Sequence, residues 1–291
     1  MFICEDKLVL YHMKKDTLFD IFQLPDCEFL YSAGIIGMGP NDFINIDVRS
    51  FRPTPNGFLF YDTGVKILKE VFIKENSLFI DNENRKHFET DHMPVNGFTK
   101  LNDSLYFYFG DMNNKEVEYA LYNYNSQTEY TSITYPNWAK KQTLDQLPIF
   151  TYMKNVVTKP DGEFFVSFYT YFKRLRIYDQ MGVLCNDIKV EIPPFNNNIE
   201  TNTEERLLSY YGYPKTVGDY IYVFCKNAKY KNMFEVSTTE LQVWKWDATP
   251  VATYDLGVNL THFAISEKYH KIYAVDSQHE ECFYVFDLPH F

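Results

Sequence analysis

Residues 103–107 read Asp-Ser-Leu-Tyr-Phe, two turn-forming residues followed by an apolar and aromatic run. This order is typical of a β-strand that leaves a tight turn. The same pattern recurs at 6–10, 56–60, 161–166, 218–222 and 270–274. The first apolar residues of the six runs are separated by 50, 47, 59, 56 and 52 residues, and we call them anchors: Leu8, Phe58, Leu105, Phe164, Tyr220 and Ile272. The near-even spacing indicates an internal repeat of about fifty residues.

Further strand-like runs surround each anchor. Leu175–Asp179 and Leu241–Asp247 follow two of the anchor strands, and Asn155–Thr158 precedes one. Three or four short antiparallel strands repeated six times predict an all-β fold, a six-bladed β-propeller in one domain of residues 1–291. The expected blades span about 1–46, 47–92, 93–136, 148–194, 206–256 and 257–291. The last repeat supplies three strands, which predicts a three-stranded sixth blade or a natural chain that starts before Met1.

Composition limits the function classes. The 291 residues include 26 Phe, 24 Tyr and 3 Trp, a usage that suits pleated, half-buried surfaces. Lys and Arg number 28 against 39 Asp and Glu, so the net charge of −11 disfavours binding to a nucleic-acid backbone. The basic loop at Lys226, Lys229 and Lys231 is therefore interpreted as solvated. No stretch reaches the ~20 apolar residues of a membrane helix. The five scattered cysteines are expected to be small buried residues.

The segment Gly34-Ile35-Ile36-Gly37-Met38-Gly39-Pro40-Asn41-Asp42-Phe43 connects the first two repeats. It resembles the Gly-x-Gly-Pro-Gly-Glu-Phe signature of bacterial TolB-like six-bladed propellers, relatives of the NHL-type propellers. Gly37, Gly39, Pro40 and Phe43 match, whereas Asn41 and Asp42 stand where Gly and Glu are usual. The resemblance implies a cell-envelope or periplasmic protein, although residues 1–10 contain no signal peptide. Asp42 is kept as a candidate ligand contact.

Local catalytic signatures are missing from the sequence. It contains no phosphate-binding loop, no G-x-S-x-G and no H-E-x-x-H, so we expect no cofactor and no local catalytic motif. The cluster of His87, Glu89, Asp91 and His92 is interpreted as a polar loop rather than a metal site. Six-bladed propellers also include calcium-dependent lactonases with a metal in the central channel, which leaves a metal-dependent hydrolase as the alternative function. Its candidate ligands here are Asp42, Asp47, Asn96, Asn155 and Asp161.

Four long insertions interrupt the repeat, near 137–147, 193–213, 111–118 and 226–239. All fall on connectors that share one face of a propeller, where insertions commonly gather around a binding site. A helical turn is expected near 137–147. Exposed Tyr, Trp and Arg side chains there would contact a protein or stack on a glycan. The expected ligand-binding residues are Trp138, Tyr169, Tyr171, Arg174, Tyr210, Tyr211, Tyr213, Tyr230 and Asp42. The sequence thus predicts a non-catalytic, monomeric binding or scaffold propeller that recognises a protein or glycan.

Overall fold

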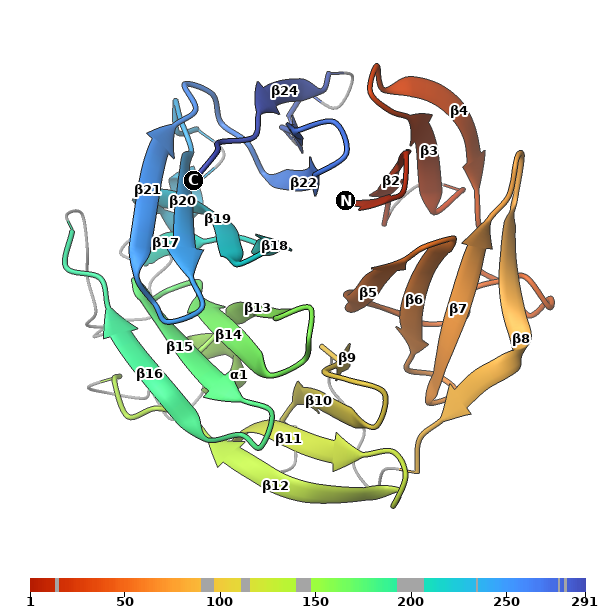
Figure 1. The fold of residues 1–291 in the computed structure, drawn as a ribbon, viewed down its shortest axis with the longest axis horizontal. Helices are drawn as coiled ribbons and strands as arrows, with labels where there is room; N and C mark the ends of the chain where they lie inside the picture. Colours follow the sequence, from red (N-terminus) through yellow and green to blue (C-terminus); the bar gives the residue numbers. More distant parts are fainter. Residues whose placement is uncertain are drawn as a thin grey trace.

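Six small antiparallel sheets form a ring in the computed structural model, which confirms the six-bladed β-propeller (Figure 1). The structure describes residues 1–13, 16–89, 97–110, 116–139, 148–192, 207–233, 235–276, 278–279 and 282–291. Each sheet is built from one stretch of chain, and its strands follow one another in sequence from the centre of the ring outward. Two short helical elements, α1 (Pro148–Thr151) and the 3-10 helix η1 (Tyr230–Asn232), lie on connectors.

The strand bounds of the first three blades follow the expected order. Blade 1 contains β1 (Phe2–Cys4), β2 (Lys7–Tyr11), β3 (Phe19–Gln23) and β4 (Glu28–Ala33). Blade 2 contains β5 (Ile46–Thr54), β6 (Gly57–Asp62), β7 (Ile67–Ile73) and β8 (Leu78–His87). Blade 3 contains β9 (Thr99–Lys100), β10 (Leu105–Phe109), β11 (Val117–Asn123) and β12 (Thr128–Thr134).

The remaining blades differ from one another at their inner and outer edges. Blade 4 contains β13 (Lys154–Thr158), β14 (Phe164–Tyr169), β15 (Arg174–Asp179) and β16 (Leu184–Lys189). Blade 5 contains β17 (Leu208–Tyr211), β18 (Lys215–Val217), β19 (Tyr220–Lys229), β20 (Glu240–Lys245) and β21 (Pro250–Asp255). Blade 6 contains β22 (His262–Ser266), β23 (Lys271–Val275) and β24 (Tyr284–Asp287). All six anchors lie in the strand next to the inner edge, which we call the second strand. In blade 5 this strand is β19, because β17 and β18 both pair with it and together form the inner edge.

The second strands are largely apolar because both of their faces are buried between blades. In β10, Phe107 packs against Phe165 of blade 4, with ring centroids 4.6 Å apart. Tyr106 and Tyr108 point the other way, into a cluster with Tyr61 of blade 2. Alternation along the strand thus serves two interfaces instead of one buried and one solvated face. This packing explains why the anchor runs show no polar residue at every second position.

Blade 6 has three strands in the described part of the chain, and side chains join it to blade 1. Leu8 and Leu24 of blade 1 form one buried cluster with Ala264 and Tyr273 of blade 6. At the same interface, Phe22 meets Phe283 edge-on at a centroid distance of 4.9 Å. Figure 1 shows β22 and β24 beside the red strands of blade 1. The ring is therefore closed by packing of side chains between the two blades.

The connector at 34–43 is a compact loop, and residues of its glycine-rich motif hold the loop in shape. Asp42 accepts a hydrogen bond from the Gly39 N–H at 2.7 Å. A Cβ at Gly37 would lie 2.3 Å from the Asp42 carboxylate, so any larger residue there would displace the side chain that accepts the Gly39 hydrogen bond. Phe43 is fully buried between Phe19 and Phe60. The motif thus shapes the approach to β5 and anchors it in the core.

The cysteines only partly meet the expectation of burial. Cys4 and Cys225 are buried, and Cys27 is half-buried. Cys185 and Cys282 are exposed, because Cys185 lies on the outer strand β16 and Cys282 lies on the connector before β24. No described helix has the length and apolar character needed to cross a membrane.

Candidate ligand-binding site in the central channel

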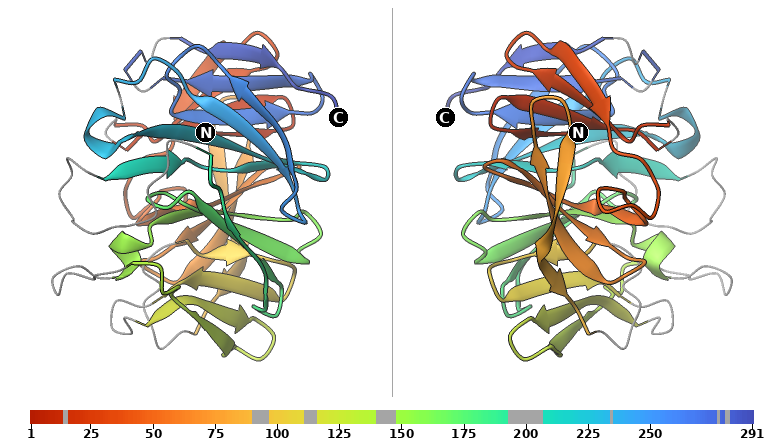
Figure 2. Two further views of the ribbon diagram at one scale, coloured as in Figure 1. Left: turned by 90° about the vertical axis from the view of Figure 1, so that its left-hand side faces the viewer. Right: turned by 90° about the vertical axis from the view of Figure 1, so that its right-hand side faces the viewer.

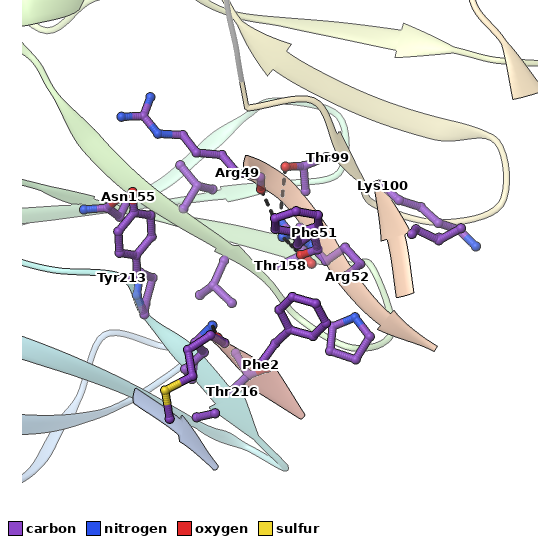
Figure 3. A pocket seen from close by; sticks show the side chains of 18 of the residues that line it. Phe2, Arg49, Phe51, Arg52, Thr99, Lys100, Asn155, Thr158, Tyr213 and Thr216 are labelled. Carbon is purple, nitrogen blue, oxygen red and sulfur yellow. Dashed lines mark hydrogen bonds between the residues drawn. The ribbon is translucent and has the colours of Figure 1, made fainter. Parts of the chain in front are cut away.

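The inner strands of all six blades surround one cavity of about 880 Å³ at the centre of the ring. Its walls come from β1, β5, β9, β13, β18 and β22, and Figure 3 shows lining side chains that include Phe2, Phe51 and Tyr213. Small-molecule sites in proteins usually have volumes of roughly 300–1,000 Å³. The channel therefore has the size of a small-molecule site.

The two ends of the channel differ in structure. Every inner strand begins at the face that carries the insertions and ends at a short turn on the other face, because each sheet is antiparallel. Figure 2 shows the ring edge-on, with α1 and η1 projecting from the insertion face. Tyr213 and His262 lie toward this face and stack, with ring centroids 5.4 Å apart and planes at 24°. Lys159 and Asp161 mark the opposite mouth.

A large bulge in β5 brings side chains into the channel. Asp47 pairs with Tyr61 and Arg52 pairs with Leu59, so five steps along β5 match two steps along β6. The buried Asp47 holds this bulge by accepting hydrogen bonds from the Arg49 N–H at 3.1 Å and the Phe98 N–H at 2.8 Å. Burial raises the pKa of Asp47. Bulges often re-aim side chains next to functional sites, and this one presents Arg49 and Arg52 to the cavity.

A smaller bulge interrupts the inner strand of blade 5. Tyr211 of β17 pairs with Cys225, and Lys215 of β18 pairs with Tyr222. Four steps on the inner side therefore match three steps on β19. The break contains Tyr213, which lines the channel and is 38% exposed, and it leads directly into Lys215.

Positive charge predominates in the channel. Among the described lining residues, five are basic and two are acidic, namely Arg49, Arg52, Lys100, Lys159 and Lys215 against Asp103 and Asp161. This balance is the reverse of the whole chain, which has 28 basic and 39 acidic residues. Burial and the neighbouring Arg52 lower the pKa of Lys215 from its ordinary value to about 8. Desolvation among the blades lowers the pKa of His262, although its ring remains exposed to the channel.

Several tyrosines expected at the surface are buried. Tyr169, Tyr210 and Tyr211 have exposures of 0–2%, and Tyr171 is 8% exposed. Tyr169 lies on the doubly buried strand β14, and its hydroxyl donates to Glu118 at 2.7 Å. The expectation of exposed contact residues is corrected at these four positions. Tyr169, Tyr210 and Tyr211 lie on strands packed between blades, and Tyr171 lies on the connector between β14 and β15.

Trp138, Tyr169 and Arg174 do come together, at the interface of blades 3 and 4. The Trp138 ring meets Tyr169 edge-on at 4.8 Å. The guanidinium groups of Arg174 and Arg176 lie 4.1 and 4.6 Å from the Trp138 ring centroid. Asp187 in turn contacts Arg174 at 3.3 Å and Arg176 at 2.8 Å. Trp138 is half-buried in this stack, which is separate from the channel lining.

The other predicted residues lie in different places. Tyr230 is 37% exposed and meets Tyr171 edge-on at 5.8 Å. Asp42 lies on the connector of blades 1 and 2, outside the cavity lining. Tyr213 is the predicted contact residue that reaches the channel. The expected helical turn near 137–147 falls partly outside the described residues, and α1 follows at Pro148.

The described metal candidates do not converge. Asp47 is engaged in the bulge, Asp161 forms an ion pair with Lys159 at 2.6 Å, and Asn155 donates to the Tyr211 carbonyl at 3.3 Å. The described part of the chain contains no group of three or more His, Cys, Asp or Glu side chains that could hold a metal ion. Asn96, Asp91 and His92 lie outside the described residues.

Arg52 and Lys215 are channel residues that the sequence analysis did not identify. They come from blades 2 and 5 and are 163 positions apart, so no local motif joins them. A usable signal was present nonetheless: each is a charged residue five or six positions before an anchor, where the repeat predicts an inner strand.

Comparisons with known proteins support the fold. No family model and no curated protein matches the sequence. A member of the DUF4221 family from Bacteroides vulgatus is similar in structure, with a TM-score of 0.61 and 11% identity over 98% of this chain and 93% of that one. A functionally unknown protein from Desulfotomaculum acetoxidans reaches 0.48 at 11% identity, covering 98% and 93%. A putative exported protein from Bacteroides fragilis also reaches 0.48 at 11%, covering 94% and 80%.

Proposed function

We propose that this protein is a non-catalytic binding propeller whose ligand occupies the central channel. The observation that carries the proposal is the cavity of about 880 Å³, into which two bulged inner strands direct Arg52, Tyr213 and Lys215. Bulges at the inner edge interrupt regular strand pairing, and here both place polar side chains in the cavity. On this proposal, the ligand enters the channel from the insertion face.

Binding rather than catalysis is supported by the chemistry of the described lining. General acid–base catalysis needs a titratable group poised near the working pH. The two lining carboxylates, Asp103 and Asp161, are engaged with Lys100 and Lys159 at 2.8 and 2.6 Å. His262 has a lowered pKa and is neutral at pH 7. Lys215, whose pKa is lowered to about 8, is the lining group that titrates near neutral pH, but it has no carboxylate ion-pair partner among the described residues to share a proton with. The described lining therefore offers mainly shape and positive charge.

A channel-filling variant tests the proposal. Thr216 lines the cavity (Figure 3), so the larger side chain of Thr216→Trp should take up ligand space. The matched control is Thr253→Trp on the exposed outer strand β21. Both variants and the wild type are screened by thermal shift against a small-molecule library that includes Ca²⁺ and EDTA. We expect ligands that stabilise the wild type and the control but not Thr216→Trp. Ligands that stabilise all three equally would place the site elsewhere, and reversal by EDTA would support the hydrolase alternative.

A second function, recognition of a protein at the insertion face, is favoured by exposed aliphatic side chains. Ile35, Ile36 and Met38 on the connector of blades 1 and 2 are 51%, 69% and 88% exposed. Exposed aliphatic side chains suit a protein partner better than a glycan. A photo-crosslinking residue at Met38 tests this, with Met181 on a turn of the opposite face as the control, itself 56% exposed. Equal crosslinking at both positions would contradict a specific interface. The TolB-like resemblance, the envelope location and the monomeric state stay predictions.

A further inference from the structure

We propose that the channel binds a small organic anion, an apolar molecule with a carboxylate or phosphate group held between Arg52 and Lys215. The inference rests on the proposed function, because it assumes that the channel is the ligand site. It adds the chemical class of the ligand and the two residues that recognise its charged group.

The first support is the environment of Arg52. Its guanidinium donates to the carbonyl oxygens of Phe51 at 2.8 Å and Arg49 at 3.3 Å, and to the Thr99 hydroxyl at 3.0 Å (Figure 3). These three acceptors are neutral, so they orient the guanidinium without cancelling its charge. The buried Nε has no hydrogen-bond partner among the described residues. A fixed guanidinium facing a cavity is well suited to a carboxylate or phosphate oxygen.

The second support is the position of Lys215 on the opposite side of the ring. Its Nζ donates to the Met1 carbonyl oxygen at 3.1 Å, again a neutral acceptor. Across the described chain, neither Lys215 nor Arg52 has a carboxylate within 4.0 Å. The two cations are close enough for the charge of Arg52 to lower the pKa of Lys215. Like charges that face one another in a protein-walled space are unfavourable, and an anion between them removes the repulsion.

The third support is a contrast within the channel. Lys100 pairs with Asp103 at 2.8 Å, and Lys159 pairs with both Asp161 at 2.6 Å and Glu163 at 2.8 Å. These lysines lie toward the turn face and are neutralised. The described cations without an ion-pair partner, Arg52 and Lys215, therefore lie in the middle of the channel. The buried Asp47 is the carboxylate that acts on Arg52, from beyond ion-pair distance.

The apolar part of the ligand follows from the walls beside these cations. Phe2 and Phe51 form a tilted ring pair with centroids 5.4 Å apart, and both line the cavity. Val157 adds an aliphatic surface, and the Tyr213–His262 stack lies toward the insertion face. Free inorganic phosphate would leave this apolar surface unused. An organic anion uses both the walls and the charge.

The experiment uses three probes with one aromatic ring each: phenylacetate, phenyl phosphate and the neutral 2-phenylethanol. Binding to the folded wild-type protein is measured by calorimetry, with inorganic phosphate as the control for a bare anion. Lys215→Met is the decisive variant, because among the described residues the Lys215 side chain makes a single hydrogen bond, to the Met1 carbonyl. Arg52→Met is the second variant, and Lys245→Met on β20, exposed and outside the channel, is the matched control.

We expect at least one organic anion to bind, with 2-phenylethanol and inorganic phosphate much weaker. Charge-assisted hydrogen bonds typically contribute enough that Lys215→Met should raise Kd roughly tenfold or more, whereas Lys245→Met should not. Preference between phenylacetate and phenyl phosphate identifies the charged group. Equal binding of the neutral probe, or unchanged binding by Lys215→Met, would overturn the anion inference while leaving channel binding intact. Failure of both organic anions at millimolar concentration would also overturn it. If every library ligand stabilises Thr216→Trp as much as the wild type, the proposed function is overturned instead.

Discussion

Replacing Glu118 by Gln removes one charge from a buried ion pair between blades 3 and 4. Glu118 on β11 is fully buried and Lys154 on β13 is 3% exposed, with Oε1 and Nζ 2.8 Å apart. The Lys154 ammonium also lies 4.7 Å from the ring centroid of Tyr119 and 5.0 Å from that of Tyr135. Tyr169 donates to the same carboxylate oxygen at 2.7 Å. Gln keeps an oxygen acceptor for Tyr169, so the substitution isolates the lost charge.

The expected cost follows from burial. Removing one partner of a buried ion pair leaves an uncompensated charge and typically costs about 3–5 kcal/mol. The aromatic rings around Lys154 stabilise its cation by about 0.5–2 kcal/mol. They do so with and without Glu118, so this contribution does not change the expected cost. Unfolding entropy of about 2.1 cal/mol/K per residue gives about 0.6 kcal/mol/K for 291 residues. The melting temperature of Glu118→Gln should therefore fall by roughly 5–8 °C.

Scanning calorimetry of four proteins tests this reasoning. Glu163→Gln is the matched control, because Glu163 pairs with Lys159 at 2.8 Å but is 59% exposed, and it should shift the melting temperature by less than about 2 °C. The double variant Glu118→Gln/Lys154→Met removes both charges and should recover most of the loss. A Glu118→Gln melting temperature within about 2 °C of wild type would refute the view that the pair is buried and uncompensated when broken.

Three further predictions concern the channel, a tight turn and the seam of the ring. Burial and the neighbouring Arg52 lower the pKa of Lys215 to about 8, so between about pH 8 and the ordinary lysine pKa the unfolded chain holds more protons than the folded one. Stability should rise with pH in this window, and the rise should vanish in Lys215→Met. The affinity for an organic anion should fall above about pH 8. Gly57→Ala places a Cβ 1.8 Å from the Val71 carbonyl oxygen and should destabilise the folded protein by about 1–3 kcal/mol in urea unfolding. Gly64→Ala is the control, because its Cβ would make ordinary contacts. Equal unfolding midpoints for the two variants would contradict the steric argument. Phe283→Ala removes the edge-on contact with Phe22 and should lower the free energy of unfolding by at least about 0.5–1.5 kcal/mol. Phe291→Ala, at the exposed chain end, should lower it less. The opposite order would mean that the contact between blades 1 and 6 does not stabilise the ring.

The fold was predictable because the repeat is written into short, local patterns. Leu105–Phe109 is apolar at every position, and its length and turn signal identify a strand buried on both faces. Six such strands at similar spacing leave few architectures open. The three-stranded last blade was also among the expected outcomes, since few residues of the sequence follow the anchor Ile272.

The channel site was not predictable in the same way, because its chemistry is assembled across the ring. Arg52 reaches the cavity through a bulge that depends on Asp47 and the Phe98 N–H of the next blade. Lys215 faces it from the far side of the ring. For the same reason the sequence analysis wrongly expected Tyr211 at the surface, because it lies beside a long insertion. In the structure Tyr211 pairs with Cys225 of β19, and its side chain is buried in the core. Exposure is decided here by bulges of one to three residues, which leave no mark in composition or periodicity.

The way the ring closes has a consequence during synthesis. Each described sheet is a contiguous stretch of chain, so five of the six blade interfaces join neighbours in sequence. The remaining interface joins Leu24 to Ala264, 240 residues later. At translation rates of about 5–20 residues per second, the apolar side of blade 1 waits roughly 12–48 s for its partner. A nascent chain with blades 1 to 5 folded would thus present an incomplete ring with two unmatched apolar faces, the stage at which ribosome-associated chaperones have a surface to bind.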